Sequence, residues 1–256
     1  HGVEVRRVDL NDADSPEQAL IQAMDSNTRL LSTSSVHYAD GLQMRLSELR
    51  SACKQYNSLL CVDAIQSLGA MPFDVQAIDA DFVMADGHKW MLGPEGLALF
   101  YCRAELREQL KLSQYGWHML ADSGDYNSLD WQVCPTAKRF ECGSPNMLAC
   151  YALNSSLSLL QEVGMQSVCK AILNNVNYLR AALGEVEGIQ FHSPADRPSG
   201  ILNFSIDGVD SRALQQALMQ HKVICAHRGQ GVRFSPHFYT DKACLDRAVC
   251  LVKTLS

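Results

Sequence analysis

Apolar and polar residues alternate along the first hundred residues in blocks that indicate strands and helices in turn. Near-continuous apolar runs predict four strands, at 29–36, 59–63, 81–85 and 96–102. Apolar residues at helical intervals, such as Leu42, Leu46 and Leu49, predict helices at 16–24 and 41–56. Strands that alternate with helices and have no polar face are typical of a parallel sheet covered on both sides. The pattern therefore predicts an α/β fold.

The second half of the chain has a different pattern. Residues 113–144 are irregular and rich in Ser, Asp, Asn, Gly and aromatic residues, and they are too long to be a mere connection. We expect them to serve a site or an interface, with Trp117 as a candidate pocket residue. Two helices are expected to follow, at 145–163 and 165–183, and then an α+β unit with strands at 189–192, 201–205, 223–225 and 232–235 and helices at 211–221 and from 241. This organisation predicts a large domain with a connecting helix over residues 1–160 and a small α+β domain over 161–256.

Composition narrows the classes of function. The 256 residues carry a formal net charge of −6, which gives no basic field for a nucleic acid. No run of eighteen apolar residues is present, so no membrane segment is expected. The ten cysteines form no CxxC pair, which favours buried free thiols in a reducing, cytoplasmic setting over disulfides or a metal site. A small molecule is the expected partner.

The strongest local signal is the segment ADGHKWMLGPEGLALFY at 85–101, where a polar turn with Lys89 follows a buried strand. Ligands of parallel α/β sheets bind outside the carboxyl ends of the strands, which is where this turn places Lys89. Apolar walls and a cationic neighbour would lower the pKa of a lysine, as imine formation with an aldehyde requires. His88 offers a ring that can stack on a planar cofactor or bond to it. A solvated loop lysine is the alternative.

A second segment, CVDAIQSLG at 61–69, is a strand that ends in Asp63, with Gln66 a short turn later. A carboxylate there can accept a hydrogen bond from a protonated pyridine nitrogen, which makes the ring an electron sink. Gln66 could reach the phenolic oxygen of the same ring. Asp63 could instead be an ordinary helix N-cap. If the two segments end neighbouring strands, both face one site.

These residues resemble the class V aminotransferase family of fold type I pyridoxal-phosphate enzymes, which includes cysteine desulfurases, selenocysteine lyases and isopenicillin-N-epimerase-like proteins. The resemblance covers essentially the whole chain. It implies a three-layer large domain with a mainly parallel sheet, and pyridoxal 5'-phosphate as the cofactor. It further implies that Lys89 holds the cofactor as a Schiff base, that Asp63 pairs with the pyridine nitrogen, and that Gln66 and His88 belong to the cofactor site.

Two further motifs agree with the resemblance. The segment RFECGSPN at 139–146 is similar to the family segment whose Gly-Ser/Thr pair reaches the phosphate of the partner subunit's cofactor, which implies that Gly143 and Ser144 do so in a homodimer. The segment VRFSPHFYT at 232–240 resembles the motif whose arginine binds the α-carboxylate of the substrate, which implies this role for Arg233. Arginine suits a bidentate carboxylate contact.

The chain departs from the family pattern at several places. Asp86 stands where the family often has a Ser or Thr that contacts the phosphate, and Tyr38 stands where it often has Asn. The stretch AHRGQGVR is too short for the mobile loop that carries the nucleophilic cysteine of desulfurases, and Cys225 ends an apolar strand, so desulfurase activity is disfavoured. The phosphate loop and ring-stacking residue at the family's N-terminus have no counterpart, so we expect a large domain that lacks its N-terminal part.

Three functions remain open at this point. The first is a pyridoxal-phosphate enzyme that performs transamination, lyase or epimerase chemistry on an amino-acid substrate. The second is a non-catalytic or cofactor-poor fragment of the same fold, which the missing segment and Asp86 favour. The third is a nucleotide-binding α/β domain, which the absence of GxGxxG and GxxxxGK[ST] motifs disfavours.

Overall fold

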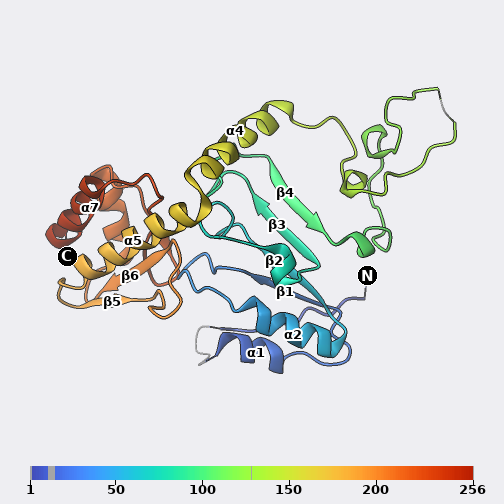
Figure 1. The fold of residues 1–256 in the computed structure, drawn as a ribbon. Helices are drawn as coiled ribbons and strands as arrows, with labels where there is room; N and C mark the ends of the chain where they lie inside the picture. The colour runs from blue at the N-terminus through green and yellow to red at the C-terminus, as the bar shows by residue number, and fades with distance from the viewer. Residues whose placement is uncertain (1, 11–14, 128, 256) are drawn as a thin grey trace.

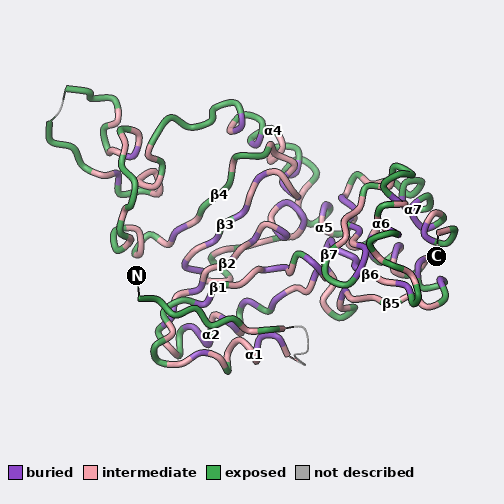
Figure 2. The backbone as a smooth tube through the Cα atoms, turned by 180° about the vertical axis from the view of Figure 1, so that it is seen from behind, coloured by how far each residue is buried: buried purple, intermediate pink, exposed green. Residues whose placement is uncertain are grey.

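Two four-stranded sheets organise the chain (Figure 1). The structure is a computed structural model that describes residues 2–10, 15–127 and 129–255. Each sheet has its own apolar core, and a third apolar cluster, which includes Trp90, Leu160 and Ile201, packs segments from both halves of the chain together. The two ends of the chain lie on opposite sides of the molecule in both overall views (Figures 1 and 2). The predicted α/β fold is confirmed.

The first sheet has the strand order β1-β2-β3-β4, and its strands are β1 (Leu30–Ser34), β2 (Leu59–Asp63), β3 (Phe82–Asp86) and β4 (Ala98–Cys102). β1, β2 and β3 pair in parallel, but β4 is antiparallel to β3. The predicted mainly parallel sheet is confirmed, and β4 is its antiparallel strand. The physical reason is the connection, since a parallel pair needs a crossover of about a dozen or more residues, usually with a helix. The segment 87–97 between β3 and β4 contains no helix.

Three helices belong to this half of the chain: α1 (Pro16–Gln22), α2 (Leu46–Tyr56) and α3 (Val75–Ile78). α1 and α2 lie together on one side of the sheet (Figure 1). That side carries the buried residues of the strands, such as Leu60 and Val83, whereas Leu30, Met84 and Phe100 on the other side are 48%, 37% and 43% exposed. One face of the sheet is only partly covered.

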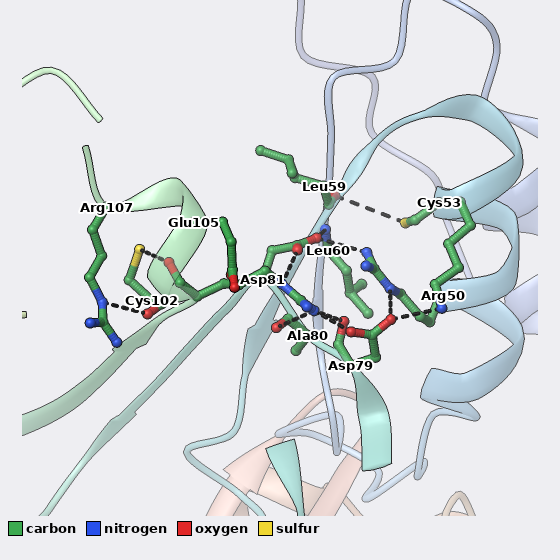
Figure 3. Close-up of polar contacts among 12 residues, drawn as sticks. Arg50, Cys53, Leu59, Leu60, Asp79, Ala80, Asp81, Cys102, Glu105 and Arg107 are labelled. Carbon is green, nitrogen blue, oxygen red and sulfur yellow. Dashed lines mark hydrogen bonds and ion pairs between the residues drawn. The ribbon is translucent and has the colours of Figure 1, made fainter. Parts of the chain in front are cut away.

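Charged residues fix the start of β3 (Figure 3). The Asp81 carboxylate is 3% exposed and accepts hydrogen bonds from Arg50 of α2, from Arg103 after β4 and from the Leu60 amide, each at 2.8 Å. Neighbouring Asp79 pairs with Lys54, Arg103 and Arg50, and these contacts hold the pKa of its carboxyl far below the usual range. The network ties α2, β2, β3 and β4 together. It also anchors the strand whose far end leads to Lys89.

The second sheet is antiparallel throughout, with the order β5-β6-β8-β7. Its strands are β5 (Ile189–Phe191), β6 (Leu202–Ile206), β7 (Ala226–Arg228) and β8 (Gly231–Phe234), and its helices are α5 (Met165–Leu183), α6 (Ser211–Gln220) and α7 (Lys242–Leu255). The strand predicted at 223–225 is wrong. The Val223 amide instead donates to the Leu218 carbonyl to end α6, and the strand begins only at Ala226.

The helix α4 (Met147–Val163) leads from the first half of the chain to α5 and the second sheet (Figure 1). Residues 113–144 before it are irregular, as predicted, and their described part contains the short 3₁₀ turns Trp117–Met119 and Ala137–Phe140; a further one, Ala104–Leu106, follows β4. Much of this segment is exposed (Figure 2).

All ten cysteines are free, and three of them (Cys53, Cys102 and Cys134) are buried, whereas Cys244 and Cys250 are exposed. Free thiols were predicted, but not all of them are buried. Among the described helices, none combines the length and the apolar composition that a bilayer crossing requires.

Candidate active site

Asp63 and Lys89 come from neighbouring parallel strands. β2 ends at Asp63 and pairs in parallel with β3, which ends at Asp86, just before the turn that carries Lys89. The carboxyl ends of parallel strands meet at one edge of a sheet, where open α/β sheets bind their ligands. The prediction that the two segments end neighbouring strands is confirmed. The alternative role of Asp63 as a helix N-cap is not confirmed, because residues 64–69 form turns and no helix begins there.

The loop that carries Lys89, residues 87–93, is closed by its own backbone. The Gly93 amide donates to the Gly87 carbonyl at 2.8 Å, and the Leu92 amide donates to the Lys89 carbonyl at 3.1 Å. From α4, the Ser156 hydroxyl donates to the Leu92 carbonyl at 2.8 Å. These bonds fix the backbone around Lys89. Its side chain can therefore act from a defined position.

Trp90, next to Lys89, joins the two predicted motifs. Its indole N–H donates to the Gln66 side-chain oxygen at 2.9 Å, and both residues are buried. Gly69 permits this approach, because its φ is +91° and an added Cβ would lie 2.3 Å from the Trp90 carbonyl. Since the oxygen of Gln66 is engaged, its NH₂ group is what remains for a ligand. No signal in the sequence predicts this contact, although Trp90 is adjacent to Lys89.

The surroundings of Lys89 lower its pKa. Burial is the largest cause, followed by the positive charge of Arg233, while the carboxylates of Asp63 and Asp86 oppose the shift and Arg228 adds to it. The charges of Asp63 and Arg233 therefore both act on Lys89. Sequence reasoning missed Arg228, which lies only five residues before Arg233 in the chain. A lower pKa leaves more of the amine neutral, which is its nucleophilic form.

Arg233 lies on β8 and is only partly paired. One guanidinium nitrogen donates to the Tyr38 carbonyl at 2.6 Å, and Nε is buried without a hydrogen-bond partner. Burial and the nearby Arg228 both lower the pKa of Arg233. Such an arginine has donors available for an anion.

The remaining predicted residues lie as follows. The Asp63 carboxylate accepts a hydrogen bond from the Ile65 amide at 2.9 Å through one oxygen. Gly143 and Ser144 are exposed and precede α4. Trp117 is 44% exposed and Tyr38 is 52% exposed, so neither is a core residue.

Comparison with known proteins decides the family. The family described as aminotransferase class-V matches residues 1–246 of the 256. The chain belongs to this family. Class V members that resemble it include the uncharacterized aminotransferase YcbU of Bacillus subtilis (strain 168), which is 32% identical over 84% of this chain and 56% of its own length.

Solved structures show the same fold. The apo structure of a cysteine desulfurase from Thermococcus onnurineus NA1 matches with a TM-score of 0.87 at 21% identity, over 99% of this chain and 66% of that one. A mutant of C-DES with glycine covalently linked to its PLP cofactor matches with a TM-score of 0.86 at 20% identity, over 94% of this chain and 64% of that one. The class V chain described here thus spans about half the length of the curated relatives it matches.

The residues of this class V chain largely fit pyridoxal phosphate, the cofactor that the fold family implies. His88 has a buried Nδ1 without a hydrogen-bond partner, which could bond to an anionic group. The free NH₂ of Gln66 and the Asp63 carboxylate suit a phenolic oxygen and a protonated ring nitrogen. Asp86 is the exception, since a carboxylate repels a phosphate. The donor set therefore fits the ring better than it fits the phosphate.

Cys225 does not have the character of a nucleophile. Burial raises the pKa of its thiol to about 11, so it is protonated at neutral pH. The stretch that follows it forms the tight hairpin of β7 and β8 and leaves no room for a long mobile loop. Both observations agree with the prediction that desulfurase activity is disfavoured, although several class V relatives are cysteine desulfurases.

Proposed function

We propose that this chain provides the cofactor lysine and the substrate carboxylate site of a pyridoxal-phosphate enzyme that acts on an amino acid, by transamination, elimination or epimerisation. The observation that supports it most is the convergence of Asp63, Lys89 and Arg233, from two adjacent strands and a second sheet, on one edge of the first sheet. Pyridoxal phosphate supplies an aldehyde for the amine and a ring that stabilises negative charge on Cα.

Each residue has a defined task in this proposal. Lys89 attaches the cofactor and then carries the Cα proton, for which its lowered pKa suits it. With the cofactor bound, Asp63 would keep the ring nitrogen protonated, Gln66 would donate its NH₂ to the phenolic oxygen, and His88 would bond to the phosphate. Arg233 binds the α-carboxylate of the substrate through its free donors. The positive charge of Arg228 nearby further favours anionic substrates.

The test is direct attachment of the cofactor. Purified chain mixed with pyridoxal phosphate should show a visible absorption band, and borohydride should fix the cofactor to the peptide that contains Lys89. The variant K89A should lose the band, and the matched control K170A, which removes an exposed lysine of α5, should keep it. A wild-type chain without a band, or a band that survives in K89A, would refute the proposal.

A homodimer is the second part of the proposal, with Gly143 and Ser144 serving the phosphate of the partner's cofactor. Three large apolar residues directly after this pair support it: Met147, Leu148 and Tyr151 are 54%, 82% and 69% exposed on α4. Exposed apolar patches of this kind mark interaction sites. Sedimentation should show a dimer for the wild type and a monomer for L148D. A monomeric wild type would contradict it.

Asp86 supports one alternative, a cofactor-poor fragment of the same fold. Its partly buried carboxylate acts on the charge of Lys89, and its own negative charge opposes a phosphate. If Asp86 limits cofactor binding, D86S should bind pyridoxal phosphate more tightly than the wild type in a titration of the visible band. Equal affinity of the two proteins would remove the support for this alternative.

A further inference from the structure

The turn at 38–43, which follows β1, is bound to the second half of the chain through its backbone. Four of its carbonyl groups accept hydrogen bonds from side chains of that half, and the pairs are Tyr38 with Arg233, Ala39 with Asn203, Gly41 with Ser199, and Gln43 with Arg197. We call this segment the 38–43 turn. It is the place where the first sheet and the substrate-binding arginine meet.

Asn203 is, together with Ser199, the most buried of these donors. It is 1% exposed and lies on β6, directly opposite Arg233 of β8 in the register of the second sheet. Its side-chain NH₂ donates to two carbonyls at once, that of Ala39 at 2.8 Å and that of Arg228 at 2.8 Å. A single amide therefore connects the 38–43 turn to the hairpin that carries both arginines.

Arg233 depends on this connection for its orientation. Its described hydrogen bond goes to the Tyr38 carbonyl, one residue before the carbonyl that Asn203 holds. A shift of the Ala39 carbonyl must move the adjacent peptide and with it the acceptor of Arg233. Arg228, whose carbonyl Asn203 also holds, repels Arg233 electrostatically. Asn203 thus fixes both the acceptor of Arg233 and the backbone of its like-charged neighbour.

We propose that Asn203 is a positioning residue that holds Arg233 in the orientation required to bind the substrate carboxylate. This rests on the proposed function of Arg233. Asn203 itself touches neither substrate nor cofactor. Its two hydrogen bonds act through the 38–43 turn and the β7–β8 hairpin.

The first experiment measures Arg233 without any reaction of the enzyme. Phenylglyoxal modifies accessible arginines, and mass spectrometry can follow Arg233 against exposed Arg212 as an internal reference. In N203A, Arg233 should react about fivefold faster than in the wild type, the factor expected when one ordinary hydrogen bond is lost. The matched control is N175A, because Asn175 also donates its NH₂ to two backbone carbonyls, those of His237 and Thr240, and its loss should leave the rate unchanged.

Two outcomes would overturn the proposal: an unchanged rate for Arg233 in folded N203A, or an equal acceleration in N175A. If N203A fails to fold, N203S takes its place, since a hydroxyl can still donate to one of the two carbonyls. It should show a smaller acceleration in the same direction. An unchanged rate in folded N203S would then count against the proposal.

The second experiment separates this proposal from the proposed function. N203A should keep the visible cofactor band of Lys89, and KM for the amino-acid substrate should rise about fivefold with kcat changed less, because ground-state carboxylate binding is what is lost. If the wild type shows no band, the proposed function is refuted, and the rates at which phenylglyoxal modifies Arg233 remain the test of Asn203. A band and a KM both unchanged in N203A refute the role of Asn203 alone.

Discussion

Replacement of Asp81 tests the charged network that anchors β3. The D81A variant removes an acceptor that is 3% exposed and that serves Arg50, Arg103 and the Leu60 amide at 2.8 Å each. All three bonds are charge-assisted, worth about 1.5–3 kcal/mol each, two of them are ion pairs, and removal of one partner of a buried ion pair costs about 3–5 kcal/mol. The two arginines keep Asp79 and some contact with water. We therefore expect the lower part of that range, about 3 kcal/mol.

Asp79 provides the matched control. Its carboxylate pairs with the same two arginines and with Lys54, but it is 30% exposed. Although these cations lower its pKa strongly, solvent screens an exposed pair, so D79A should cost only about 1 kcal/mol. Urea unfolding measures both variants, and in thermal unfolding D81A should lower the midpoint by roughly 6–12 °C. If D81A is no less stable than D79A, the assignment of the network's strength to the buried carboxylate is wrong.

Three further predictions concern the site. W90F leaves the buried oxygen of Gln66 without its donor and should lower the free energy of unfolding by about 1–3 kcal/mol in urea titrations; a change below that range would contradict it. G41A places a Cβ 2.7 Å from a neighbouring hydroxyl at a φ of +76°, and should cost about 1–3 kcal/mol by the same assay, whereas a neutral effect would show that the turn can relax. R233Q removes a cation that lowers the pKa of Lys89, so the neutral amine should appear only at higher pH. The pH at which half of the cofactor band has formed should therefore rise, and an unchanged midpoint would refute this coupling.

Local patterns in the sequence predict most elements of the first half of the chain. The strand at 59–63 matches β2 and the one at 81–85 differs from β3 by one residue, because continuous apolar runs between polar turns leave few alternatives. The helix predicted at 41–56 begins only at Leu46. Residues 41–43 instead belong to the 38–43 turn, and their backbone bonds to the second half of the chain. Such long-range contacts override local helical spacing.

In the candidate site, too, some residues could be predicted from the sequence and others could not. Asp63 and Lys89 could be predicted because each directly follows a strand, and a parallel pair brings strand ends together. Asn203 could not, because it is an ordinary polar residue in an apolar strand and both its acceptors are backbone carbonyls, one of them 164 residues away. The direction of β4 and the partly covered face of the first sheet likewise depend on packing that no local pattern contains.

The 38–43 turn has a consequence for how this site can change over generations. Its bonds to the second half of the chain all use carbonyl oxygens, which every amino acid possesses. A substitution at Tyr38, whose side chain is 52% exposed, therefore alters the surface presented beside Arg233 without removing any of these bonds. The side chain at position 38 can therefore change while the backbone bonds around it persist. This position is a suitable first one for a library that seeks new substrates.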